Sequence, residues 1–173
     1  SGGHTQFLSV KNLGKYKRLG TTIDDALGEA FDKTAKMIGI EFPGGPFIEK
    51  FAEKGNSKRF NLPKPILKKG GCNMSFAGLK TAVLKISKTI KNEQDKNDLA
   101  ASFQNTIQEI LYVKTKNAFK EFLGKNKKKN NTFVVAGGVA ANKSIKKTLI
   151  NLSYEEGFKP IFPPLEFCGD NAA

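Results

Sequence analysis

Apolar and polar positions alternate in two different ways over the first forty residues. Residues 5–10 alternate with the period of two that is typical of a strand, and residues 16–21 are the expected hairpin partner. A helix is then expected from Thr22 to about Ile38, with Thr22 or Asp24 as its N-cap. Four residues share the apolar side of this helix: Leu27, Phe31, Thr34 and Ile38.

Glycine and proline separate this helix from the next one. Gly39 is expected to end the helix, the PGGP run at residues 43–46 to form a rigid turn, and residues 47–53 to form a short second helix. Residues 55–73 are rich in lysine, proline and glycine, which predicts irregular backbone.

Helical spacing returns in the middle of the chain. Residues 78–90 predict a helix, and residues 91–97 an exposed polar loop. The residues after this loop recur at spacings of three and four, which predicts a long, largely amphipathic helix that ends at Gly124. They are Leu99, Phe103, Ile107, Ile110, Leu111, Lys114, Ala118 and Phe122.

The last section predicts a strand, a turn, a helix and a second strand. The strands are expected at residues 132–136 and 158–162, the turn at residues 137–138 and the helix at residues 141–152. Such a βαβ unit implies a parallel sheet that binds ligands at the carboxyl ends of its strands.

The chain with this α/β pattern is strongly basic. The chain has 29 lysines and arginines against 16 acidic residues, which gives a net charge of +13 carried almost entirely by lysine. A basic surface favours a polyanion such as tRNA, but lysines that are merely solvated on helix faces and loops would give the same composition. The densest run, residues 125–129, is expected to be an exposed loop.

The sequence also restricts where the protein acts. No apolar run approaches the roughly 20 residues that span a bilayer, and no signal peptide is visible, so we expect no membrane partner. Cys72 and Cys168 form no CxxC pair and are expected to be buried thiols, which fits a cytoplasmic location.

Four glycine-centred runs are the strongest indication of a binding site: SGGHT at residues 1–5, FPGGP at 42–46, AGGV at 136–139 and CGDN at 168–171. One glycine pair is weak evidence, because strand ends and helix caps use glycine everywhere. Four such runs, most with a polar or acidic residue nearby, suggest that separate stretches of backbone approach one ligand, such as a phosphate or a ribose.

An acidic side of the first predicted helix carries Asp25, Glu29 and Asp32. It reads either as a solvated stripe near the helix N-terminus or, at Asp32, as a carboxylate that binds a ribose diol beside the backbone amides of Gly44 and Gly45.

Two polar residues near the other glycine runs have two readings each. Asn142 follows a turn that needs positive φ, and it could also bind an adenine edge or a ligand carbonyl. Asp170 is either a helix N-cap or a hard oxygen ligand to a metal, whose other ligands would come from elsewhere. His4 is the single histidine, and the chain contains no HExxH motif and no phosphate-binding P-loop motif.

Together these motifs resemble the tRNA N6-adenosine threonylcarbamoyltransferase family, formerly described as O-sialoglycoprotein endopeptidases, and most closely its bacterial catalytic subunits. The resemblance runs in order through nearly the whole chain: SGGHTQ (1–6), TTIDDALGEAFDKTAKMIGIEFPGGP (21–46), SFAGLKTAV (75–83), ASFQ (101–104), VVAGGVAAN (134–142) and CGDNAA (168–173). Small departures are Met74, Ala77 and Gly169, where the family usually has Phe, Ser and Thr.

The resemblance implies a partial actin-like or sugar-kinase-like α/β ATPase fold, an internal fragment with the end of the first lobe and most of the second. Residues 1–22 would be a hairpin at the end of the N-terminal lobe, residues 23–131 the helical part of the cleft and second lobe, and residues 132–173 the βαβ nucleotide-binding part of that lobe. The family's pair of histidine metal ligands would lie outside this segment, so we expect the chain alone to be inactive.

The resemblance also implies the chemistry. The family transfers a threonylcarbamoyl group from threonylcarbamoyl-AMP to N6 of adenosine 37, next to the anticodon, in tRNAs that read codons beginning with adenine. It implies substrate binding by Ser1, Gly2, Gly3, Asp32, Gly45 and Asn142, and a divalent metal ion, iron or zinc, on Asp170. No residue of the segment is an obvious general base, so positioning and electrostatics would dominate the catalysis.

The implied partners are tRNA, threonylcarbamoyl-AMP, a paralogous dimer partner and an ATPase accessory subunit. A small-molecule kinase or ATPase of the same fold is one alternative function, and a non-catalytic paralogous scaffold subunit is another. Peptidase activity has no support in these residues.

Overall fold

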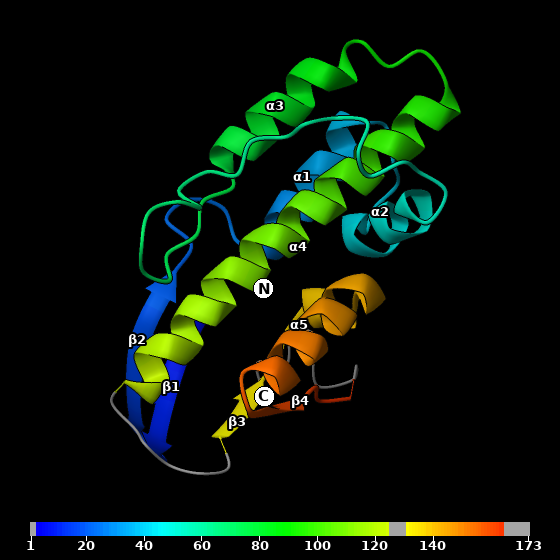
Figure 1. Ribbon diagram of the computed structural model, residues 1–173. Helices are drawn as coiled ribbons and strands as arrows, with labels where there is room; N and C mark the ends of the chain where they lie inside the picture. The colour runs from blue at the N-terminus through cyan, green and yellow to red at the C-terminus, as the bar shows by residue number, and fades with distance from the viewer. Residues whose placement is uncertain (1–2, 125–130, 165–173) are drawn as a thin grey trace.

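The computed structural model of the protein describes residues 3–124 and 131–164 (Figure 1). A hairpin is followed by four helices and by a strand–helix–strand unit. The bounds are β1 Gln6–Asn12, β2 Lys15–Thr21, α1 Leu27–Met37, α2 Gly44–Ala52, α3 Ala77–Ser87, α4 Glu93–Leu123, β3 Asn131–Val134, the 3-10 helix η1 Gly138–Ala141, α5 Lys143–Glu155 and β4 Phe158–Ile161.

The predicted hairpin is confirmed. β1 and β2 pair antiparallel, from Gln6 opposite Thr21 to Asn12 opposite Lys15. The chain then makes one further bridge, in which Met74 N donates to Thr21 O at 3.0 Å, so the irregular segment after α2 is attached to the hairpin.

Helix α1 begins later than the sequence predicts. Its first residue is Leu27, whose N–H donates to Thr5 Oγ1 at 3.0 Å, so neither Thr22 nor Asp24 caps it. The Asp24 carboxylate instead accepts hydrogen bonds from Phe76 N at 2.7 Å and Ser75 Oγ at 2.5 Å, where α3 begins. Local spacing favours a local cap, whereas the tertiary structure uses a threonine that lies 22 positions earlier.

The predicted turn at residues 43–46 is mostly helix. Gly39 ends α1 with φ of 69°, as expected, but α2 already begins at Gly44 rather than at residue 47. A Cβ added at Gly44 would lie 2.7 Å from Asp32 Cα and Phe31 O, so the absence of a side chain lets α2 start against the backbone of α1.

The predicted polar loop at residues 91–97 is wrong. Helix α4 begins at Glu93, because the Asn92 side chain accepts a hydrogen bond from Asp95 N at 2.8 Å and caps it. Asp95 and Asp98 are buried, and each binds the Arg59 guanidinium, at 2.6 and 2.8 Å respectively. Their partners lie in the irregular segment, which spacing along the helix does not reveal.

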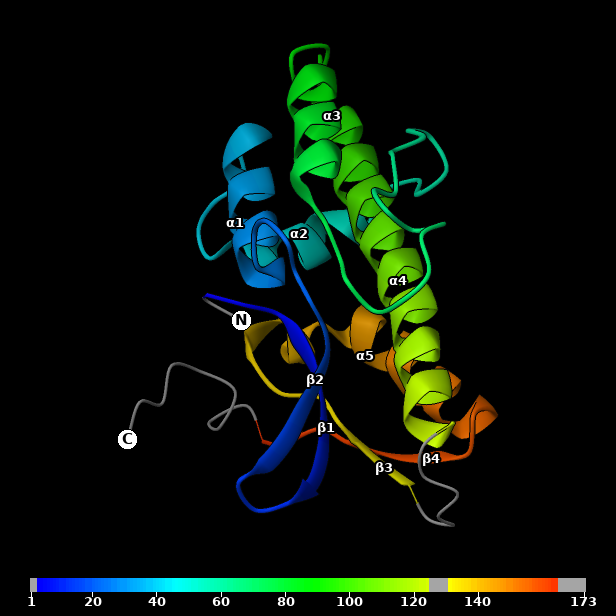
Figure 2. The ribbon, with the colours of Figure 1, turned by 90° about the vertical axis from the view of Figure 1, so that its left-hand side faces the viewer.

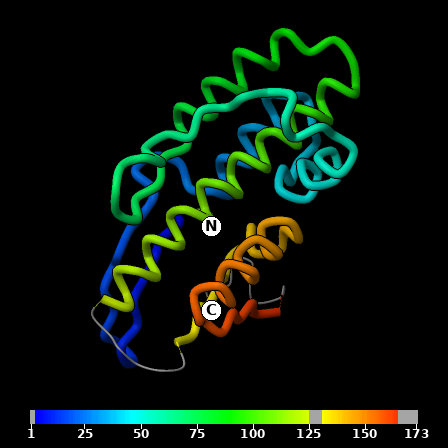
Figure 3. The backbone as a smooth tube through the Cα atoms, in the orientation of Figure 1, coloured from blue at the N-terminus to red at the C-terminus, as the bar shows by residue number. Residues whose placement is uncertain are grey.

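Helix α4 is the spine of the molecule. It passes the hairpin at its C-terminal end and α2 at its N-terminal half, with α1 and α3 alongside (Figures 1 and 2). The tube in Figure 3 shows the irregular segment between α2 and α3 running along α4. The core lies between these helices and includes an edge-on contact of Phe31 with Phe103, with ring centroids 5.1 Å apart.

The predicted parallel strand pair is also confirmed. β3 and β4 pair in parallel, from Asn131 opposite Phe158 to Val134 opposite Ile161, and α5 connects them. The turn after β3 has positive φ at Gly137, 100°, and leads through η1 into α5. No helix within the described ranges is long and apolar enough to cross a membrane.

Candidate functional site

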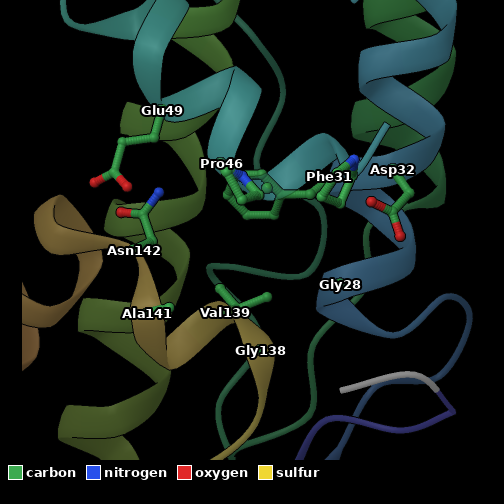
Figure 4. Close-up of a pocket in the computed structure, with 11 residues that line it drawn as sticks. Gly28, Phe31, Asp32, Pro46, Glu49, Gly138, Val139, Ala141 and Asn142 are labelled. Atoms are coloured by element: carbon green, nitrogen blue, oxygen red, sulfur yellow. The ribbon is translucent and has the colours of Figure 1, made fainter. Parts of the chain in front are cut away.

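A cavity of about 460 Å³ lies where α1, α2 and the η1–α5 turn meet (Figure 4). Its volume falls in the range of small-molecule binding pockets. Phe31, Pro46 and Val139 form apolar walls, and polar groups lie around them. Apolar walls with a few polar groups suit a flat ring that carries hydrogen-bonding edges.

Asp32 lies on the α1 side of this cavity (Figure 4). Its Oδ1 accepts a hydrogen bond from Gly44 N at 2.8 Å, so it caps the N-terminus of α2. Within the described part of the chain, no residue donates a hydrogen bond to Oδ2. One oxygen is therefore structural, and the other is available to a ligand.

Gly45 lies beside this cap and also lines the cavity. No atom lies within 4 Å of the position where its Cβ would be. A side chain at Gly45 would therefore project into free space, in contrast to one at Gly44, which would collide with α1.

Asn142 lies across the cavity from Asp32 (Figure 4). Its Oδ1 accepts a hydrogen bond from Ile145 N at 2.9 Å and caps α5, while its Nδ2 donates to Gln104 Oε1 at 2.7 Å. Three residues predicted from distant motifs, Asp32, Gly45 and Asn142, are thus brought to one cavity.

Glu49 was not predicted as a site residue. It projects from α2 toward Asn142 (Figure 4), and its Oε1 accepts hydrogen bonds from Lys143 N at 2.7 Å and Ser144 N at 3.3 Å. The sequence held an indication of this position, since Glu49 follows Gly45 by four residues and so lies on the same side of a helix. The N-termini of α2 and α5 both point toward the cavity, and each is covered by a carboxylate from another element.

The remaining predicted residues lie elsewhere. Gly3 is exposed and does not line this cavity. His4 and Thr5 line a separate cavity of about 260 Å³ beside β3. Ser1, Gly2 and Asp170 fall outside the described residues, as do the lysine run at 125–129 and Cys168.

The acidic side of α1 is not a solvated stripe. The Asp25 side chain is only 14% exposed, and it forms ion pairs with Lys80 of α3 and with Lys33, the latter at 3.0 Å. Glu29 pairs with Lys33 at 2.7 Å, and this hydrogen bond lowers the pKa of Glu29. Asp25 therefore joins α1 to α3, and Asp32 is the one residue of the three that reaches the cavity.

No group of three or more His, Cys, Asp or Glu side chains that could hold a metal ion occurs in residues 3–124 and 131–164. Cys72, the one cysteine in those ranges, is a free and buried thiol, as expected. Burial and the nearby Glu121 carboxylate raise the pKa of this thiol.

Comparison with known proteins identifies the chain. The sequence profile of the family described as tRNA N6-adenosine threonylcarbamoyltransferase matches residues 1–173. Proteins with this name are similar to the chain over its whole length: 71% identical in Pelagibacter ubique (strain HTCC1062), 53% in Rickettsia conorii (strain ATCC VR-613 / Malish 7) and 52% in Rickettsia bellii (strain OSU 85-389). The match covers 48%, 51% and 51% of these relatives, so the chain spans about half their length. The predicted α/β class with part of an actin-like fold agrees with this match, and the chain belongs to the tRNA N6-adenosine threonylcarbamoyltransferase family.

Proposed function

We propose that the cavity between α1, α2 and the η1–α5 turn binds the adenosine part of threonylcarbamoyl-AMP. The observation that carries this proposal is the meeting of Asp32, Gly45 and Asn142 around one cavity of about 460 Å³. A carboxylate oxygen of Asp32 suits a ribose diol, an amide at Asn142 suits a base edge, and backbone without a side chain at Gly45 admits close approach.

The complete protein then transfers the threonylcarbamoyl group to N6 of adenosine 37 of tRNA. The residues of this chain bind and orient the adenylate, so that the tRNA amine attacks the carbamoyl carbon and AMP leaves. No described side chain in the cavity is placed as a general base, and positioning supplies the chain's contribution. The net charge of +13 favours a tRNA partner through contacts with phosphates.

A divalent metal ion, iron or zinc, belongs to the same proposal through Asp170 and ligands outside this chain. Asp170 lies outside the described residues, and the described ones hold no ligand cluster.

The lobe assignment is likewise proposed. Residues 1–22 would belong to the end of the N-terminal lobe, 23–131 to the helical part of the cleft and second lobe, and 132–173 to the nucleotide-binding part. The proposed setting is the cytoplasm, with a paralogous dimer partner and an ATPase accessory subunit.

A hybrid protein tests this function. The chain replaces the matching residues of the Pelagibacter ubique relative, and the hybrid is incubated with threonylcarbamoyl-AMP, unmodified tRNA and the expected partner subunits. Mass spectrometry of the digested nucleosides should show threonylcarbamoyladenosine, and the amount should fall with Asp32→Ala. Phosphate transfer to a small molecule without tRNA would indicate the kinase alternative, and no product would indicate a scaffold.

A further inference from the structure

Two glutamines one turn apart on α4 reach toward α5, and only one of them contacts a residue of the cavity. Gln104 accepts the hydrogen bond from Asn142 Nδ2 at 2.7 Å. Gln108 Nε2 instead donates to Ser144 Oγ at 2.9 Å, Ser144 O at 3.1 Å and Thr148 Oγ1 at 3.0 Å. The first glutamine therefore touches the site, and the second joins the same two helices beside it.

The Asn142 amide has little freedom left. Its oxygen is committed to Ile145 N, and one of its two N–H groups is committed to Gln104 Oε1. In Figure 4 the oxygen points toward α5, and the nitrogen lies on the opposite side. Among the described residues, the second N–H has no acceptor, and Asn142 lines the cavity.

Burial strengthens these hydrogen bonds. Asn142 and Gln104 are only 6% and 7% exposed, so water competes little for their hydrogen bonds. Without an acceptor at residue 104, the Asn142 amide keeps its contact to Ile145 N but loses the partner that fixes its nitrogen. The amide is then held at one atom instead of two, so its terminal torsion, which has a broad energy minimum for asparagine, is less restricted.

We propose that Gln104 is a positioning residue that fixes Asn142 so that it presents one N–H donor to the ligand. The inference rests on the proposed function, because it assigns the free N–H to an acceptor atom of a bound adenine. The same role accounts for the ASFQ run at residues 101–104, in which the sequence had indicated no site residue. Its last residue, Gln104, orients Asn142.

The test uses three variants of the hybrid protein, in which the chain replaces the matching residues of the Pelagibacter ubique relative. Gln104→Met removes the acceptor at similar length, Gln104→Glu keeps an oxygen that accepts from Asn142, and Gln108→Met is the matched control, since it breaks an α4–α5 contact that does not involve Asn142. The Asn142 side-chain N–H pair is assigned in nitrogen-15 NMR spectra by its loss in Asn142→Asp. AMP binding is measured by calorimetry, and the unfolding midpoint is recorded for every variant.

In the spectra, the hydrogen-bonded proton of Asn142 should move upfield in Gln104→Met and stay in place in Gln108→Met. The dissociation constant for AMP should rise about ten-fold in Gln104→Met, which corresponds to one hydrogen bond. It should stay within about two-fold in Gln108→Met and return to within about three-fold of the original value in Gln104→Glu. A merely structural role would instead weaken binding equally in both methionine variants, in step with the unfolding midpoint.

The outcomes separate this inference from the proposed function. If the unaltered hybrid binds AMP and its Gln104→Met variant binds it equally well, the positioning role is overturned while the proposed function stands. An Asn142 resonance that is unchanged in Gln104→Met overturns the inference without reference to any ligand. If the unaltered hybrid binds no AMP, the proposed site is wrong, and with it the presentation of the Asn142 N–H to a ligand.

Discussion

Asp32 Oδ1 accepts a hydrogen bond from Gly44 N at 2.8 Å, and through this contact the middle of α1 holds the first turn of α2. Asp32 also lines the proposed adenosine cavity, and no described residue donates a hydrogen bond to its other oxygen. One side chain thus serves both the fold and the site, so stability and binding must be measured separately for each variant.

Substitution of Asp32 should lower both the stability of the fold and the affinity for AMP, to different extents. Asp32→Ala removes the cap of α2 and should lower the free energy of unfolding by about 1 kcal/mol, whereas Asp32→Asn keeps an acceptor and should cost less. Both variants should weaken AMP binding. Urea unfolding and calorimetry measure the two effects.

The control for this prediction is Asn92→Ala, which removes the cap of α4 at a residue that does not line the cavity. It should lower stability by a similar amount and leave AMP binding unchanged. If the Asn92→Ala chain lost AMP binding to the same degree, the binding effect at Asp32 would be a consequence of stability alone.

Gly45→Ala should weaken AMP binding without lowering the stability of the fold. No atom lies within 4 Å of the new Cβ, and alanine is favoured over glycine in a helix by roughly 0.5–1 kcal/mol, so the variant should be at least as stable. Gly45 lines the cavity, so the added methyl group should take up space there and weaken AMP binding. Calorimetry checks the binding, and urea unfolding checks the stability.

Two other glycines serve as controls for Gly45. Gly70→Ala places a methyl group in equally open space outside the cavity and should leave AMP binding unchanged. Gly44→Ala should destabilise the chain, because its Cβ would meet the backbone of α1. Unimpaired AMP binding by Gly45→Ala would place the ligand elsewhere.

The sequence predicted the elements better than their beginnings. Periodicity found α1, α4 and the parallel strand pair, because apolar spacing reports which side of an element is buried. It missed that Thr5 caps α1 and that Asp95 and Asp98 are buried, because those partners are distant in the chain. Contacts with distant residues decide where these helices begin, and the spacing of apolar residues within one segment does not reveal such contacts.

The candidate site shows the same division. The glycine runs and their neighbours predicted Asp32, Gly45 and Asn142, which lie at chain turns where motifs are visible. Glu49 and Gln104 lie inside helices, where a single polar residue looks like any solvated side chain. Their roles appear once α2 and α4 are packed against the start of α5.

The Arg59 network should make stability fall in acid. Hydrogen bonds from Asn56 N and Arg59 lower the pKa of Asp98, and those from Lys91 N and Arg59 lower the pKa of Asp95. A carboxylate whose folded-state pKa is lowered stabilises the fold above its unfolded pKa, about 3.9, and loses that contribution as the pH falls through the lower folded-state value.

Asp98→Asn tests this dependence. The variant should be less stable than the unaltered chain at pH 6, because Asn56 N and Arg59 lose a charged acceptor. The gap in free energy of unfolding should narrow as the pH falls below about 4. Urea unfolding at several pH values measures it, and a gap that is constant from pH 6 to pH 2 would contradict the assignment.

Lys114 combines a correct prediction with a partner that the sequence did not reveal. Its spacing assigned it to the buried side of α4, and its side chain is fully buried there. The ammonium group donates to Ile66 O at 2.9 Å and Lys69 O at 2.8 Å, and thereby holds the irregular segment against α4. Burial lowers the pKa of Lys114.

Lys114→Met should destabilise the chain although methionine has a similar length and is apolar. Among the described residues, it removes the donor to Lys69 O and leaves Ile66 O with only Lys69 N, which donates at 3.2 Å. A carbonyl group left unsatisfied costs about 1–3 kcal/mol. Lys116→Met, on the more exposed side of the same helix, removes the surface pair with Glu156 at 2.8 Å and the cation–π contact with the Tyr112 ring, and should cost about 1 kcal/mol or less. Urea unfolding compares the two variants, and faster hydrogen exchange at residues 66–71 in Lys114→Met alone would localise the effect. Equal losses in the two variants would mean that Lys114 does not hold this segment.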